Sequence, residues 1–303
     1  MPNVKLKNQL HLHFLVFIAG FTAILGELIS IKAIPLVWIR MIIASLIIFI
    51  FVKLSKTSIK IPAKKIVKLG VAGIIIALHW ITFFGSIDVA NVSIALTMFS
   101  TGAFFASFIE PIIYKRKIIW YEILFGLFIV IGVLIITESE IKYFNGIVLG
   151  VFSGLFASIF AVLNGKFLEQ HSPTIISFYE LISGVLFITI FMFVGQFNFT
   201  TEVFVVTAKD MLYLFILGSV CTAYAFIAAV KVMRHISPYT VVLTYNLEPV
   251  YGIILALILF PEKEIMSSSF YYGATIIILT VLINGILKNA RKLKRKQSTL
   301  NED

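Results

Sequence analysis

Five ionisable side chains interrupt stretches of sequence that are otherwise apolar: Glu27, Arg40, His79, Glu180 and Glu248. An ionised group at the centre of a membrane helix costs about 2.5–3.5 kcal/mol on insertion scales, so each of them marks a candidate functional position. Groups of these types bind ions of opposite charge and exchange protons. Ion binding and proton exchange are therefore the chemistry that this sequence offers.

Glu248 and Pro249 are adjacent in "TYNLEPVYGI". Proline has no N–H and disturbs the preceding helical turn, which frees the carbonyl near Tyr245, and Asn246 adds a further amide. Tyr245, Glu248 and Gly252 share one face of a helix. Because irregular backbone at membrane depth is stable only inside protein or along a watery cavity, we predict that this segment lines a cavity. The alternative interpretation is a proline kink beside a protonated, hydrogen-bonded glutamate.

Arg40 and Glu180 lie a few residues inside the ends of two further apolar stretches, in "PLVWIR" and "PTIISFYE". Two interpretations are open. The two residues could form a static ion pair, or separate pairs with backbone carbonyls, that holds a helix bundle together. Alternatively, Arg40 contacts an anionic group of a substrate while Glu180 balances a cationic group, and an amino-acid-like solute would suit both. Tyr179, next to Glu180, joins them as a candidate for the substrate cavity.

His79 stands in "LHWITFFG", beside Trp80 and one helical turn before Phe83. The three side chains could form an aromatic wall that stacks flat or cationic solutes, or His79 could be a hydrogen-bonded packing residue. No HExxH metalloprotease motif is present in the sequence. The single cysteine, Cys221, excludes an internal disulfide and a cysteine-rich metal cluster. We expect no metal and no cofactor.

Membrane-spanning helices must position these residues. The chain is 60% hydrophobic and 13% charged, whereas soluble domains contain about 25% charged residues. Its mean hydropathy is +1.03. A bilayer core needs about 20 apolar residues per helix. The sequence therefore predicts an all-α integral membrane protein with ten spans near 12–31, 34–53, 66–87, 91–113, 118–137, 145–165, 173–194, 211–231, 237–260 and 270–288.

The net charge of +10 is distributed unevenly between the predicted loops. If the N-terminus is cytoplasmic, 20 of the 25 basic residues fall on the cytoplasmic side, and four (Lys32, Lys142, Lys209 and Lys263) fall outside. The positive-inside rule favours this orientation. We therefore expect a multi-pass inner-membrane protein with both termini in the cytoplasm. The basic tail is most simply an anchor at anionic lipid, and no nucleic-acid partner is expected.

The sequence contains an internal repeat. Residues 90–137 align with 237–284 at a constant shift of 147 and without gaps. Each half holds five spans, an odd number, so the second half must enter the membrane from the opposite side. Such inverted repeats are typical of transporters. The predicted units are a first five-helix repeat at 12–137, a second, inverted repeat at 145–288 and a basic tail at 289–303.

The chain resembles the EamA family of the drug/metabolite transporter superfamily over roughly residues 12–287. The resemblance rests on the order of ten spans in two halves and on particular stretches. These are "ANVSIALTMFSTGAFFASFIEPIIYKRKI", "CTAYAFIAAVKVMRHISPYTVVLTYNLEPVYGIILALILFPEKE" and "FYYGATIIILTVLI".

The resemblance implies a substrate cavity between the halves, lined largely by the third, fourth, eighth and ninth spans. The positions that it implies for the cavity are His79, Trp80, Thr97, Thr101, Tyr224, Tyr245 and Glu248. The fourth span departs from the symmetric pattern, because Thr101-Gly102 stands where the ninth has Glu248-Pro249. Glu248 thus has no symmetric partner.

The expected function is transport of small metabolites or amino-acid-like compounds, as an exporter working by alternating access. Glu248 and Glu180 are the candidates for proton coupling. An uncoupled facilitator or exchanger is the alternative. A membrane enzyme is disfavoured because the outer acidic residues, such as Glu138, Glu140, Glu262 and Glu264, are scattered. A sensor is disfavoured because it would normally add a soluble output domain, and the basic tail is not one. The expected partners are a small-molecule substrate and the lipid bilayer, and a monomer is compatible with the sequence.

Overall fold

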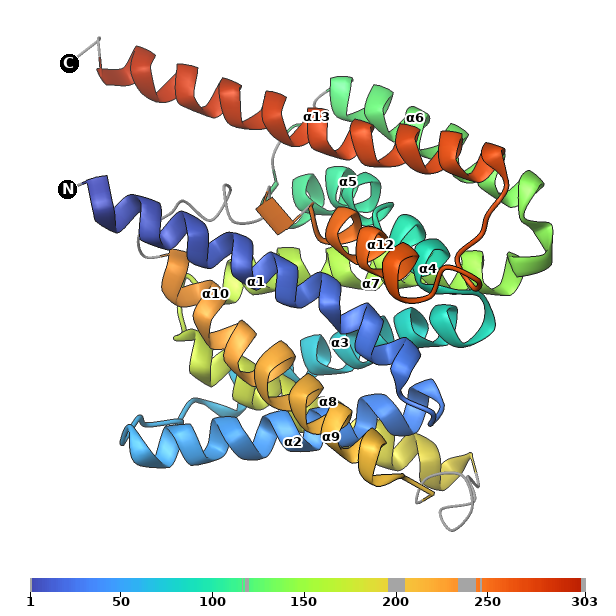
Figure 1. Ribbon diagram of the computed structural model, residues 1–303. Helices are drawn as coiled ribbons and strands as arrows, with labels where there is room; N and C mark the ends of the chain where they lie inside the picture. The colour runs from blue at the N-terminus through green and yellow to red at the C-terminus, as the bar shows by residue number, and fades with distance from the viewer. Residues whose placement is uncertain are drawn as a thin grey trace.

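The computed structural model describes residues 2–115, 117, 120–195, 205–233, 244–245 and 247–300. Every regular element in these ranges is a helix (Figure 1). The first half contains α1 (Pro2–Leu28), α2 (Ala33–Leu54), α3 (Ala63–Val89), α4 (Val92–Phe99), α5 (Gly102–Tyr114) and α6 (Trp120–Ser139). After the short 3₁₀ helix η1 (Ile141–Tyr143) come α7 (Phe144–Phe167), α8 (Pro173–Val194), α9 (Ala208–Gly218), the π-helix η2 (Ser219–Tyr224), α10 (Ala225–Met233), α12 (Glu248–Leu259) and α13 (Ser268–Leu300).

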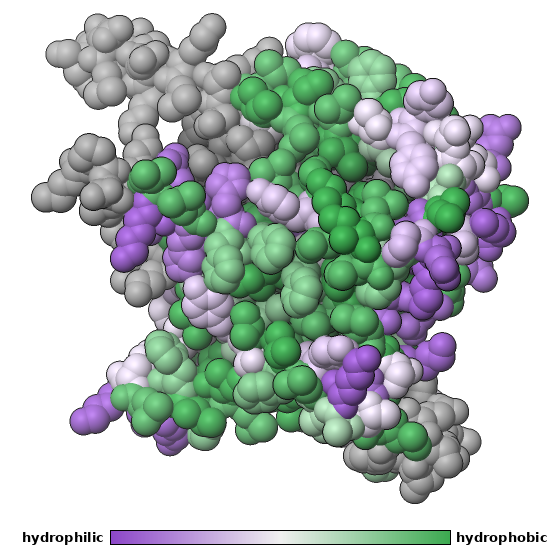
Figure 2. Space-filling model, viewed as in Figure 1, coloured by the Kyte–Doolittle hydropathy of each residue, from purple (hydrophilic) through white to green (hydrophobic). Residues whose placement is uncertain are grey.

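Length and composition suit these helices to a membrane. Within the described ranges, nine helical segments are long and apolar enough to cross a bilayer, and α12 is a shorter apolar helix. Hydrophobic residues cover the middle of the face seen in Figure 2, and hydrophilic residues gather towards its left and right edges. The all-helical architecture is as predicted. Of the predicted span 237–260, residues 237–243 and 246 lie outside the described part of the chain.

The helices run between two ends of the bundle. Figure 1 places both chain ends on the left, and we call this side the terminal end. The opposite side, on the right in Figure 1, carries the connections 28–33, 89–92 and 259–268, and we call it the distal end. The last helix, α13, continues beyond its apolar part to Leu300, so the backbone of most of the basic tail is helical.

The fourth span is interrupted between α4 and α5. The Ser100 hydroxyl donates to the Leu96 carbonyl at 3.0 Å. The Thr101 hydroxyl donates to the Met98 carbonyl at 2.6 Å. Side chains that bond to the carbonyls of the preceding turn compete with the helical ladder. The helix therefore ends here, and α5 begins at Gly102.

A second interruption precedes α12. The Leu247 N–H bonds to the Thr244 carbonyl at 3.0 Å in a tight turn. Glu248 is then the first residue of α12, and Pro249 follows in the first turn, where a missing N–H removes no intrahelical bond. Glu248 therefore lies at a helix start within the predicted span, next to the proline for which the sequence predicted a disturbed helical turn. The shift of 147 relates this position to Thr101, beside the first interruption.

Helices from the two halves pack against one another at glycines. α1 packs on α12, α7 packs on α4 and α5, and α13 packs on α6. A Cβ on Gly154 of α7 would lie 2.9 Å from the backbone nitrogen of Gly102. A Cβ on Gly20 of α1 would lie 3.0 Å from the carbonyl of Glu248 and the nitrogen of Gly252. Glycine thus permits the close approach of backbones that stabilises membrane bundles, and it does so next to both interruptions.

Gly154→Ala should destabilise the bundle by about 1–3 kcal/mol, because the new methyl group overlaps backbone that cannot rotate away. The measurement is the midpoint of thermal unfolding in detergent. Gly85→Ala is the matched control, since its Cβ would meet only a Leu149 methyl group at 3.4 Å. If the two variants unfolded at the same temperature, the close crossing of α5 and α7 would be wrong.

Candidate functional site

Arg40 of α2 carries a cation deep inside the bundle, with only 2% of its surface exposed. Its Nε donates to the Thr222 hydroxyl at 2.7 Å. Its guanidinium carbon lies 4.0 Å from the centre of the Trp80 ring, a cation–π contact worth about 2 kcal/mol when water is excluded. The buried Nη1 has no hydrogen-bond partner in the part of the chain that the structure describes. The guanidinium is therefore only partly hydrogen-bonded by the described residues.

The π-helix η2 presents Thr222 to Arg40. The Thr222 hydroxyl donates its proton to the Leu217 carbonyl, five residues earlier, at 2.7 Å. Its oxygen lone pairs are then free to accept the Arg40 Nε–H. A π-helical turn inside an α-helix is rare and is often found at a functional site. Here it fixes the direction in which the guanidinium points.

Glu248 lies at the start of α12, and Arg40 lies on α2. Opposite charges on two such side chains would favour an ion pair. Nevertheless, no ion pair or hydrogen bond joins the two side chains among the described contacts. Glu248 and Tyr245 are mostly surrounded by protein, and a small part of each residue remains accessible to solvent. Arg40 and Glu248 therefore form no direct contact among the described residues.

Aromatic rings cluster around His79 and Trp80 of α3. His79 Nδ1 hydrogen-bonds to the Ser153 hydroxyl at 2.9 Å, which fixes the ring plane. The His79 ring centre lies 5.5 Å from that of Phe99 and 6.1 Å from that of Phe83. The Trp80 ring meets Phe226 edge-on at 6.0 Å. The wall therefore joins α3 of the first half to α10 of the second.

Two threonines of the fourth span, Thr97 and Thr101, are buried at or close to the interruption between α4 and α5. Thr97 is fully buried, and its hydroxyl oxygen has no hydrogen-bond partner among the described residues. The Thr101 hydroxyl is occupied by the Met98 carbonyl. Asn246, a further predicted cavity residue, lies outside the described part of the chain.

Three other candidates lie apart from Arg40. Tyr224 is 43% exposed, and its hydroxyl bonds to His11 Nε2 on α1 at 2.7 Å. The Tyr179 hydroxyl donates to the Ile59 carbonyl, in the connection between α2 and α3, at 2.9 Å. Glu180 accepts a hydrogen bond from Asn164 rather than from Arg40. The interpretation of Arg40 and Glu180 as a direct ion pair is therefore wrong for this conformation.

Carboxylates close the distal end by accepting hydrogen bonds from backbone N–H groups. Glu264, fully buried, accepts from Val92 at 3.0 Å and from Ser93 at 2.9 Å, at the start of α4. Asp210 accepts from the Ser30 N–H at 2.8 Å. Both sets of bonds tie one half of the chain to the other. The structure therefore holds the two halves together at the distal end.

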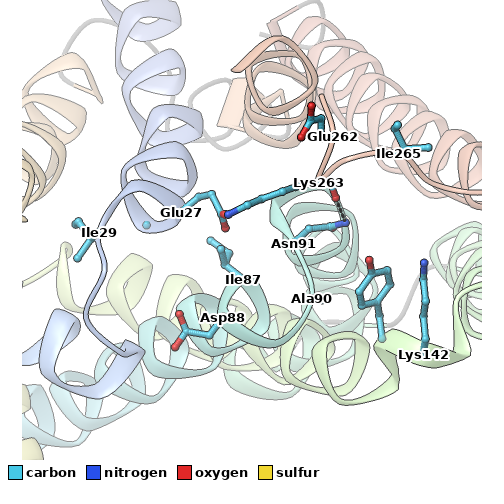
Figure 3. Close-up of a pocket in the computed structure, with 12 residues that line it drawn as sticks. Glu27, Ile29, Ile87, Asp88, Ala90, Asn91, Lys142, Glu262, Lys263 and Ile265 are labelled. Carbon is cyan, nitrogen blue, oxygen red and sulfur yellow. Dashed lines mark hydrogen bonds and ion pairs between the residues drawn. The ribbon is translucent and has the colours of Figure 1, made fainter. Parts of the chain in front are cut away.

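A cavity of about 460 Å³ opens beside these bonds. Figure 3 shows Glu27 and Lys263 meeting at its rim, while Asp88 points away from them. The Lys263 ammonium and the Glu27 carboxylate form an ion pair at 2.5 Å. The Asn91 amide donates to the Lys263 carbonyl at 3.2 Å, which fixes the connection between α12 and α13. This polar cavity is a vestibule outside the closed distal end.

Comparison with known proteins identifies the family. The model of the EamA-like transporter family matches residues 10–138 and again residues 144–286. The chain belongs to the EamA-like transporter family. It is accordingly a multi-pass membrane transporter of the drug/metabolite type.

Solved structures agree at the level of the fold. Matches extend to 27 chains. In one of them, a crystal structure, 98% of the chain aligns with 93% of this transporter, with a TM-score of 0.63 at 12% identity. At that identity the likeness shows the fold alone. No curated protein matches this sequence.

Some residues at the centre of this EamA-like transporter were not found from the sequence. Thr222 holds Arg40, Phe99 and Phe226 complete the aromatic wall, and Ser153 orients His79. Hydroxyl and phenyl side chains are common in membrane helices, so none of these positions is conspicuous. One signal was available: Thr222 follows the lone cysteine in "GSVCTAYAF", within a run of small residues that brings helices close together.

Thr222→Val should release the Arg40 guanidinium while preserving side-chain shape. Loss of a hydrogen bond to a charged group costs about 1.5–3 kcal/mol. We expect ligand affinity to fall roughly tenfold or more, since each 1.4 kcal/mol is tenfold. The measurement is the apparent Km for the transported compound. Ser219→Ala is the matched control, because this hydroxyl bonds only within its own helix, to the Phe215 carbonyl. An unchanged Km in Thr222→Val would contradict the positioning role.

Glu264→Gln should lower the free energy of unfolding by about 1.5–3 kcal/mol. The new amide group places an N–H donor, in place of an acceptor oxygen, against one of the two backbone N–H groups. Thermal unfolding in detergent measures the loss. Glu262→Gln, an exposed neighbour, is the control. A Glu264→Gln protein that unfolded with the control would show that these bonds do not hold the halves.

Lys263→Gln should have a smaller effect, below about 1 kcal/mol, because its side chain is 67% exposed. The Glu27 carboxylate raises the pKa of Lys263 above its usual value. The stabilisation is therefore complete at neutral pH and is lost only as the pH rises through that raised pKa. Unfolding midpoints of the wild type and Lys263→Gln should thus differ at neutral pH and converge in strong alkali. A difference that grew with rising pH would have the wrong sign.

Proposed function

We propose that this EamA-like transporter exports small metabolites that carry both a carboxylate and an ammonium group, as amino-acid-like compounds do. The observation that carries the proposal is the buried Nη1 of Arg40, which has no hydrogen-bond partner among the described residues. A buried cation without a contacting anion is unstable. A substrate carboxylate at Arg40 and a substrate ammonium at Glu248 would satisfy both groups and keep the site neutral.

The neighbouring rings give this site a second element of recognition. The Arg40 guanidinium already covers one face of Trp80, whereas His79 and Phe99 are only partly buried. An apolar or ring-bearing substituent would stack on the accessible rings while the charged end meets Arg40 and Glu248. We therefore expect compounds with one apolar substituent to be preferred over small polar ones.

Movement of the substrate would follow alternating access of two inverted halves. Interrupted helices at equivalent positions of two repeats are typical of transporter binding sites, and here the interruptions lie at Thr101 and Glu248. The distribution of basic residues supports cytoplasmic termini in the inner membrane, which would place the distal end outside. In that orientation the closed distal end belongs to a conformation that loads from the cytoplasm.

A proton gradient would drive export. Ionisable groups inside membrane proteins are frequently parts of proton relays, and Glu248 and Glu180 are the two buried carboxyl groups named by the sequence. Proton coupling separates this proposal from an uncoupled facilitator, which would release the same compounds at the same rate with or without a gradient.

Efflux from proteoliposomes tests the proposal. Purified protein is reconstituted with a mixed internal pool of amino acids and common metabolites, and release is followed by mass spectrometry with and without an imposed pH gradient. We expect gradient-dependent release of compounds that carry both charges. Arg40→Gln and Glu248→Gln should each lower it about tenfold to a hundredfold, because each removes a charged hydrogen-bond partner.

Glu138→Gln makes the same chemical change at an exposed position and is the control. Release of compounds with only one charge, at wild-type rates in both variants, would overturn the assignment of the site. Release that ignored the gradient would establish a facilitator instead.

A further inference from the structure

Glu180 of α8 forms a separate polar pair with Asn164 of α7. The Glu180 side chain is fully buried, and its Oε2 accepts a hydrogen bond from Asn164 Nδ2 at 3.3 Å. Two oxygen atoms of this pair, Glu180 Oε1 and Asn164 Oδ1, are buried and have no hydrogen-bond partner among the described residues. Two buried acceptors without a donor, on two side chains that are hydrogen-bonded to each other, require an explanation.

No cation in the described structure neutralises Glu180. The titratable side chains of the helices packed on α8, and of α7 and α8 themselves, are engaged elsewhere or lie at the surface. Two of them bond to side-chain hydroxyls: Arg40 to Thr222 and His79 to Ser153. Four others contact the backbone or a ring: Asp88 the Ala33 N–H, Tyr179 the Ile59 carbonyl, Lys166 the Ile113 carbonyl and Lys53 the Phe49 ring. Lys64 and Lys68 are exposed, and Lys65 is partly exposed. The side chain of Lys231 on α10 lies outside the described residues.

One proton would satisfy both orphaned oxygens. A carboxylic acid and a carboxamide form a cyclic pair in which the amide N–H donates to one acid oxygen and the acid O–H donates to the amide oxygen. The first of these two bonds is present, from Asn164 Nδ2 to Glu180 Oε2. A proton on Oε1 would complete the second bond, to Asn164 Oδ1. Without that proton, a buried carboxylate would lie beside an amide oxygen with no hydrogen between them, which is costly.

We propose that Glu180 and Asn164 form a proton-binding site, in which Glu180 carries the proton and Asn164 positions it. On release, the Oε1–H bond breaks, its electron pair stays on Glu180 and the proton passes to water. Resting on the export function proposed above, this site supplies the coupling proton and Glu248 serves substrate binding. The proton and the substrate then occupy different parts of the bundle, one on α7 and α8 and the other on α2 and α12.

The location of the pair suits this role. Asn164 lies in the last turn of α7 and Glu180 in the second turn of α8, so both belong to the terminal end of the bundle. Release of the proton needs water, and water would reach the pair when these helix ends separate. Packing between α3 and α8 is close here, because a Cβ on Gly73 would overlap the Glu180 backbone. A movement of α8 relative to α3 would therefore carry Glu180 with it.

Infrared spectroscopy tests the proton site without any substrate. Purified full-length protein in detergent is titrated from neutral to alkaline pH, and the C=O stretching band of protonated carboxyl groups is recorded. We expect the wild type to lose one such band on alkalinisation. Glu180→Gln should lack the band entirely, since its amide keeps a cyclic pair with Asn164 and preserves the fold without a titratable proton. Asn164→Leu should retain the band with a shifted midpoint.

Two controls isolate the pair. Asn284→Leu removes another amide with an orphaned buried oxygen, on α13, and should leave the midpoint unchanged. Glu248→Gln should also leave the band in place. A full band in Glu180→Gln would overturn the proposal, as would a wild type with no such band at neutral pH. Equal midpoints in Asn164→Leu and the wild type would overturn the positioning role of Asn164.

Transport by the same variants separates this site from the export function. Glu180→Gln proteoliposomes, assayed with the compounds that the wild type releases, should lose the response to a pH gradient while exchange of labelled for unlabelled compound continues. A gradient response equal to that of the wild type would overturn the coupling role. Failure of the wild type to release any compound, with the infrared band intact, would refute the export function and leave the proton site standing.

Discussion

The constraint on which the site depends is a guanidinium held inside an apolar bundle. Arg40 cannot lose its proton under ordinary conditions, so the surrounding helices must provide what water would have provided. They do so in part: Thr222 accepts from Nε, and the Trp80 face covers the planar group. Nη1 has no hydrogen-bond partner among the described residues, so that solvation is incomplete. An incomplete shell around a fixed charge is what gives a binding site its affinity for a counter-charge.

The need to solvate Arg40 inside the bundle also bears on two irregular helical segments, η2 and the start of α12. A regular α-helix through Ser219–Tyr224 would have used its own carbonyls in the usual pattern, whereas the wider turn of η2 lets Thr222 bond five residues back and still face Arg40. The start of α12 at Glu248 likewise places a carboxyl group at the first residue of a helix. Regular helix surrounds both places and is packed closely through glycine. Irregular backbone in the described residues thus includes the π-helix that holds Arg40 and the two helix interruptions, at Ser100–Thr101 and before Glu248.

The sequence predicted this architecture well where strong physical constraints act on composition. Bilayer thickness fixes the length of an apolar span, so most of the helices could be located, and charge inside a span is costly, so Arg40, His79 and Glu180 stood out. Partnerships were harder. The sequence offered Glu180 as a direct partner for Arg40, but the Arg40 guanidinium is taken by Trp80 and Thr222, while Glu180 bonds to Asn164. Pairing depends on how helices rotate about their axes, and hydropathy carries little information on rotation.

The closure of the distal end has a consequence for how readily this molecule changes shape. Its bonds run from Glu264 and Asp210 to backbone N–H groups of Val92, Ser93 and Ser30, beside a cavity that is open to the surroundings. Each of these groups is one that water solvates well. When the halves part, every lost bond can be replaced by one to a water molecule, and no large apolar surface needs to be exposed at that point. A closed form and a parted form can therefore be close in free energy, because solvent replaces these bonds one by one.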